Sequence, residues 1–111
     1  MRVNEYQEAA MATLNPALDK KDVLINSVMG LCGESGEAID IVKKWLLQGH
    51  ELDKGHLIKE LGDVAWYLAE AATALDVPLE TVLQGNLDKL RQRFPNGFDT
   101  EASVHRKEGD I

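Results

Sequence analysis

Two short acidic sequences, Glu34-Ser35-Gly36-Glu37 and Glu60-Leu61-Gly62-Asp63, decide how this chain must fold. In each sequence the two acids are three residues apart, which puts their side chains on nearly the same side of an α-helix. The surrounding residues have the apolar spacing of helices that follow one another in the chain. Four carboxylates brought together in this way repel one another unless a cation lies among them.

The whole chain predicts an all-α fold, a four-helix bundle in kind, because its apolar residues recur at intervals of three and four. Asn4 and Gln7 are typical of a capping box at the start of the first helix, and Gly49 is typical of a C-terminal cap. Three glycines within the second helix indicate either a break near residues 30–33 or close approach by another helix or a ligand. The expected helices span residues 5–13, 22–48, 56–75 and 78–94.

Length and composition indicate one globular domain. The chain has 111 residues, of which 44% are apolar and 28% charged, and we expect a domain over residues 1–98 followed by a polar, mobile tail over residues 99–111. A net charge of −7 argues against binding to a nucleic-acid polymer, which normally needs a basic surface. The lone Cys32, with no signal-type or membrane-spanning apolar run, predicts a soluble cytoplasmic protein with no membrane partner.

The position of the two pairs relative to the apolar residues separates them from chance acidic pairs such as Glu5 and Glu8. On a helical projection Glu34 and Glu60 point toward the core, while Glu37 and Asp63 lie at its border. A buried carboxylate without a partner is costly or takes up a proton. Bound metal explains this pattern, although solvated helix faces or buried pairing with Lys or Arg remain open.

Ligands that are all oxygen favour Mg²⁺, with Mn²⁺ as the alternative, over zinc. A di-iron bundle of the ferritin type requires Glu-x-x-His pairs, and this sequence has none. His50, His56 and His105 fall in loops or at helix ends, so we expect them to be surface residues rather than catalysts.

A basic face on the fourth expected helix is the second functional signal. Asn86, Lys89 and Arg93 share one side of that helix and could clamp a polyphosphate beside a carboxylate–metal cluster. The alternative is an exposed face that forms ion pairs with nearby acids. Lys43 and Lys44, one turn beyond the first acidic pair, are phosphate ligands or surface charge on the same reasoning.

These motifs together resemble the MazG-like nucleoside triphosphate pyrophosphohydrolases of the all-α type. The family signature is Glu-x-x-Glu, a spacer and Glu-x-x-Asp, and here the spacer has 22 residues. The run from Asn86 to Phe98 resembles the family segment Asn-x-x-Lys-Leu-x-x-Arg-Tyr-Pro-x-Gly-Phe, with Phe94 in place of Tyr. The resemblance covers the chain from about Tyr6 to Phe98.

The resemblance implies a site and a reaction. Its metal ligands would be four carboxylates, and either Glu34 or Glu37 would also orient or deprotonate the attacking water. Phosphate oxygens would be held by the basic face of the fourth helix, and the substrate would be cut to nucleoside monophosphate and pyrophosphate. Family members form dimers or tetramers with helices of two subunits around each site. The implied metal ligands are Glu34, Glu37, Glu60 and Asp63, and the implied phosphate ligands are Asn86, Lys89 and Arg93, with Lys44 added from its position.

Two other functions fit the same sequence. One is a non-catalytic helical module that oligomerises and binds a nucleotide or a protein, and it would not need Mg²⁺. The other is a related pyrophosphohydrolase that acts on a phosphoribosyl nucleotide, which a panel of substrates would distinguish. The sequence does not choose the base or the sugar.

Overall fold

A computed structural model describes all 111 residues, and the chain folds into helices without a β-sheet. The expectation of an all-α fold is confirmed. The chain divides into two compact units, residues 1–79 and residues 80–111. None of the helices is both long enough and apolar enough to span a lipid bilayer. The helices are α1 (Val3–Met11), α2 (Lys20–Leu47), α3 (Lys54–Ala74), α4 (Leu79–Arg93) and α5 (Thr100–Val104).

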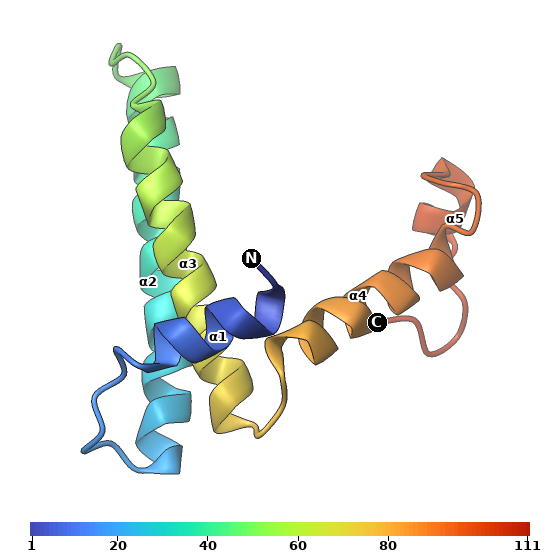
Figure 1. Cartoon of the computed structure of the whole chain (residues 1–111). Coiled ribbons are helices and arrows are strands. Elements are labelled where there is room, and N and C mark those ends of the chain that lie inside the picture. The colour runs from blue at the N-terminus through green and yellow to red at the C-terminus, as the bar shows by residue number, and fades with distance from the viewer. The chain divides into compact units, whose positions relative to one another are not determined.

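The first unit is organised around α2 and α3, which lie side by side and run in opposite directions, with α1 against α3 (Figure 1). Aspartates begin both long helices: Asp19 accepts a hydrogen bond from the backbone N–H of Asp22 (2.8 Å), and Asp53 accepts one from that of His56 (3.1 Å). Each satisfies an N–H group that has no partner within its helix. Gly49, just after α2, has a positive φ of 74° that glycine tolerates best.

The predicted capping box of Asn4 and Gln7 is wrong, because α1 begins earlier, after Arg2. Gln7 instead fastens α1 to the turn that follows α3. Its Nε2 donates to Thr73 Oγ1 (3.0 Å) and to the Val77 carbonyl (3.2 Å), and its Oε1 accepts from the Leu79 N–H (2.7 Å). The side chain therefore satisfies backbone groups at the turn into α4 rather than at its own helix start.

The buried apolar core is small and consists mostly of alanine. Large apolar residues that the helical pattern directed inward are instead exposed on α2, among them Val28 (51% exposed), Ile39 (62%) and Leu46 (62%). The buried apolar residues are Ala10, Val23, Ala69, Ala72, Ala74 and Leu79.

The second unit contains most of α4 and the residues that follow it, and the mobility expected of residues 99–111 stays a prediction. After α4 the chain turns so that the rings of Phe94 and Phe98 lie 5.5 Å apart, with Gly97 at a positive φ of 88°. Asp99 then caps the short helix α5 by accepting a hydrogen bond from the Glu101 N–H (3.0 Å).

The break that the glycines left open near residues 30–33 does not occur, and α2 is continuous. Gly30 instead meets the ring of Tyr67 on α3 so closely that a Cβ atom at this position would overlap the ring. The absence of a side chain here lets α2 and α3 approach each other, just one turn before Glu34.

We predict that Gly30→Ala destabilises the protein by about 1–3 kcal/mol, because the new methyl group displaces the Tyr67 ring. The matched control is Gly62→Ala on α3, where nothing lies within 4 Å of the added Cβ. Removing a helical glycine there should stabilise the protein by up to about 1 kcal/mol. Urea unfolding of both variants measures the difference, and equal effects would contradict the close contact.

Candidate metal and phosphate-binding site

Three of the predicted metal ligands come together where α2 and α3 face each other. One carboxylate oxygen from each of Glu34, Glu37 and Glu60 lies within 4.8 Å of the other two. Glu60 is buried (7% exposed), Glu34 is half-buried and Glu37 is exposed. This gradient follows the helical projection, in which the first acid of each pair points inward.

Two oxygens of this acidic cluster, Glu34 Oε2 and Glu60 Oε2, are buried without a hydrogen-bond partner. A deprotonated carboxylate only accepts hydrogen bonds, so neighbouring carboxylates cannot satisfy one another. Either a shared proton or a cation must relieve the repulsion. An all-oxygen donor set with unsatisfied oxygens facing inward fits a hard divalent cation such as Mg²⁺.

Without a cation, a proton can take this role. A hydrogen bond that Glu34 donates to Glu60 once it is protonated, followed by burial and the charge of Glu37, raises the pKa of Glu34 to about 7. The same hydrogen bond lowers the pKa of Glu60. Glu34 is therefore the glutamate that takes up a proton first as the pH falls, and a divalent cation entering the cluster would compete with that proton.

Asp63, the fourth predicted ligand, is not part of this group of three glutamates. It is exposed, and together with Glu34, Trp66 and Tyr67 it lines a hollow of about 340 Å³. Asp63 is also near Tyr6 on α1, since burial first and the charge of Asp63 second raise the pKa of the Tyr6 hydroxyl.

A larger cavity of about 590 Å³ has Glu37, Glu60 and Lys44 among its lining residues. Asp40 stands between two lysines here: its oxygens lie 3.1 Å from Lys44 Nζ and 3.3 Å from Lys43 Nζ. These contacts, led by Lys44, lower the pKa of Asp40. The predicted phosphate ligand Lys44 thus lies on the wall of a cavity that also contains two of the cluster glutamates.

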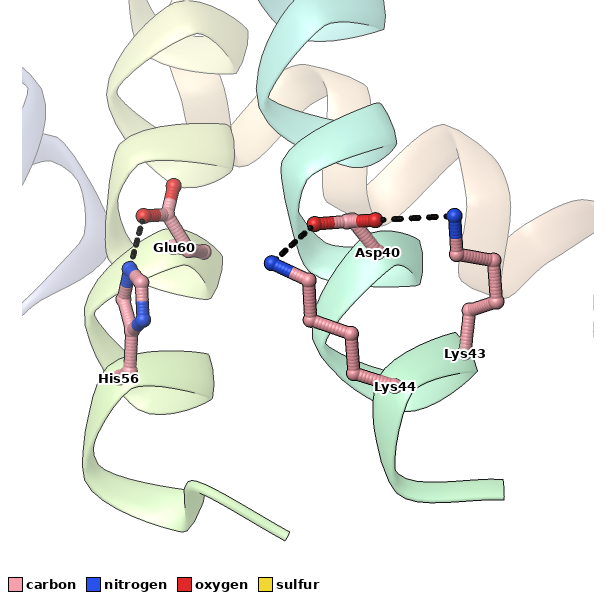
Figure 2. A network of polar contacts seen from close by, with 5 residues as sticks. All are labelled: Asp40, Lys43, Lys44, His56 and Glu60. Carbon is pink, nitrogen blue, oxygen red and sulfur yellow. Dashed lines mark hydrogen bonds and ion pairs between the residues drawn. The ribbon is translucent and has the colours of Figure 1, made fainter. Parts of the chain in front are cut away.

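One contact of the acidic cluster was not predicted from the sequence. His56 Nε2 lies 2.9 Å from Glu60 Oε1 (Figure 2), and His56 is also a lining residue of the larger cavity. The spacing of four residues, which brings side chains together on a helix, was the available signal, but a position near a helix end predicts only a surface side chain.

In the second unit, the predicted phosphate ligands Asn86, Lys89 and Arg93 lie on α4. Arg93 is engaged by the tail: its Nε and Nη2 donate to the two oxygens of Asp110 at 2.8 and 2.6 Å. This hydrogen bond, with further help from the charges of Arg106 and Lys89, lowers the pKa of Asp110. A fork of this kind is how arginine also holds phosphate.

Comparison with known protein families assigns most of this chain to one domain family. Residues 24–98 match the MazG nucleotide pyrophosphohydrolase domain, a range that contains both acidic pairs and all of α4. The chain is also 42% identical over 105 residues to the Gene 37 protein of Mycobacterium phage L5. This match covers 87% of this chain and 92% of the phage protein. No solved structure matches the chain. With most of its length inside the family match, this protein belongs to the MazG nucleotide pyrophosphohydrolase family.

Proposed function

We propose that this protein is a Mg²⁺-dependent nucleoside triphosphate pyrophosphohydrolase. It would cleave an NTP or dNTP between the α and β phosphates, with water supplying the new oxygen on one phosphate, to give a nucleoside monophosphate and pyrophosphate. The observation that carries the proposal is the pair of buried, unpartnered oxygens of Glu34 and Glu60 beside Glu37. Family membership supplies the class of reaction.

The proposed metal ligands are Glu34, Glu37, Glu60 and Asp63, and Mg²⁺ bound there would neutralise phosphate charge and polarise the bond that breaks. Glu37 is exposed at the mouth of the larger cavity, where its second oxygen can accept a proton from water. Glu34 is the alternative base. No covalent nucleophile is needed for this chemistry.

Basic side chains and one asparagine amide would bind the phosphate oxygens. Lys44 is the proposed ligand in the first unit, and it would exchange its contact with Asp40 for a phosphate oxygen. Asn86, Lys89 and Arg93 are the proposed ligands in the second unit. Because Asp110 already occupies the guanidinium of Arg93, phosphate binding there means replacing one anion by another on the same donors.

We predict that a panel of NTPs and dNTPs incubated with Mg²⁺ yields monophosphate and pyrophosphate from at least one nucleotide. Glu37→Gln and Asp63→Asn should each lower the rate by more than about 100-fold, the upper end of the losses caused by outer-shell changes at metal sites. Circular dichroism should show both variants folded. The control is Glu8→Gln, an exposed acid of the chance pair on α1.

Either of two results would sink this assignment. Release of orthophosphate and nucleoside diphosphate would place the cleavage at the wrong bond. Near-normal turnover by Glu37→Gln and Asp63→Asn would remove both acids from the reaction.

We predict that the metal-free protein loses stability as the pH rises from about 5 to 8. Folding raises the pKa of Glu34 from 4.5 to about 7, so the native state binds the proton more tightly, and this advantage disappears once the pH passes the native pKa. Carboxyl groups whose pKa is lowered by folding, such as that of Asp40, change the free energy of unfolding with pH only in more acidic solution. Urea midpoints in EDTA should fall across this range, Glu34→Gln should flatten the trend, and Mg²⁺ should restore stability at pH 8. A midpoint that rose with pH would contradict the shared proton.

We also propose that the protein works as a homodimer or homotetramer. Soluble monomers rarely expose large contiguous apolar patches, yet the outer side of α2 carries a hollow of about 520 Å³ lined by Ile39, Val42, Leu46 and Leu47. A second copy would cover this surface with its own. The small alanine core makes such cover more valuable, because little other apolar area is buried.

For this assembly we predict that light scattering finds a dimer or tetramer at micromolar concentration. Leu46→Asp puts a charge into the apolar hollow and should shift the protein toward monomer. Ala9→Asp, at an exposed position of α1, adds the same single negative charge and is the control. A wild-type monomer would overturn the proposal.

A further inference from the structure

His56 lies on the first turn of α3, one helical turn before Glu60. Its backbone N–H donates to Asp53 Oδ1 (3.1 Å), which fixes this turn, and its ring Nε2 lies 2.9 Å from Glu60 Oε1. A carboxylate only accepts hydrogen bonds, so the imidazole nitrogen that faces it carries the hydrogen. The two side chains share one helix face, and their backbones are fixed within the same helix.

The two oxygens of Glu60 have different surroundings. Oε1 receives the imidazole, whereas Oε2 is buried without a hydrogen-bond partner. One oxygen of Glu60 lies within 4.8 Å of an oxygen of Glu34 and of an oxygen of Glu37. Rotation about the last bond of a glutamate side chain is broad and roughly two-fold. A hydrogen bond to one oxygen therefore selects the carboxylate orientation and thereby the direction in which the other oxygen points.

A second His–Glu pair in the chain shows what an ordinary surface contact looks like. His105 Nε2 lies 3.6 Å from Glu101 Oε1 at the same spacing of four residues, but both side chains are exposed (69% and 80%). Pairs of that kind contribute little. The Glu60 side chain, in contrast, is only 10% exposed while His56 is 54% exposed. The imidazole therefore reaches from the cavity wall to a buried acid.

We propose that His56 is a positioning residue for the metal site: it holds Glu60 so that Oε2 is presented to a divalent cation. The inference rests on the proposed function, because it takes Glu60 as a metal ligand. Hydrogen bonds from outer-shell residues to ligating carboxylates fix their orientation. In this role His56 does not need to contact the substrate, and its effect on turnover would come through the metal.

The test uses Mn²⁺ alone as the probe, with free Mn²⁺ measured by electron paramagnetic resonance in titrations of the full chain. His56→Leu removes the donor and should weaken Mn²⁺ binding by about 10-fold or more. His56→Gln has an amide of similar reach that can still donate, and it should regain most of the affinity. His105→Leu, the same substitution in the exposed pair, should bind Mn²⁺ as the wild type does.

The outcomes separate this inference from the proposed function. Wild-type protein that binds no Mn²⁺ would overturn the metal site and with it the role of His56. Wild-type binding with equal affinities for His56→Leu and His56→Gln would overturn the positioning role alone, as would a lower melting temperature of His56→Leu without any change in Mn²⁺ affinity. If His56→Leu does not fold, His56→Ala takes its place in the comparison with His56→Gln.

Discussion

The repulsion among Glu34, Glu37 and Glu60 is the constraint on which the rest of the structure depends. Carboxylate oxygens within 4.8 Å of one another oppose the packing of α2 against α3, and the cost grows as water is excluded. The two helices nevertheless meet closely, because Gly30 leaves room for Tyr67 one turn away. The fold thus brings α2 and α3 close together, while a proton or a cation must offset the repulsion among the three carboxylates.

The helices around this site could be predicted from the sequence because the relevant information is local. Helical periodicity directs Glu34 and Glu60 inward, and Gly49 marks the end of α2 by its backbone conformation. The start of α2 was less well predicted, because the Asp19 side chain caps a helix that begins two residues before the expected residue 22. Periodicity does not say what covers an apolar side. Ile39 fits the pattern of a core residue yet is 62% exposed, and nothing in the pattern distinguishes it from a residue that is covered.

Contacts between residues that are far apart in the sequence could not be predicted from helical periodicity. Gln7 looked like a capping residue, but its amide serves Thr73 and Leu79, more than sixty positions away in the sequence. Asp110 holds Arg93 across 17 residues of turn and tail. Such contacts depend on where the chain returns in space, and a glutamine or an aspartate has no periodic signature that reveals its partner.

Two buried glutamates of α3 differ in how their oxygens are satisfied. Glu70 is fully buried, but the amide of Asn26 on α2 donates to both of its oxygens at 3.0 Å, so each oxygen has a hydrogen-bond donor. Glu60, ten residues earlier in the same helix, has a partner for one oxygen only. Burial does not distinguish Glu60 from Glu70, because both are buried. The difference is that the α2–α3 pair supplies donors to both oxygens of Glu70 but not to both oxygens of Glu60. The second oxygen of Glu60 has no hydrogen-bond donor, and two further carboxylates lie beside this glutamate. A divalent cation matches these surroundings, because it is positively charged and prefers oxygen ligands.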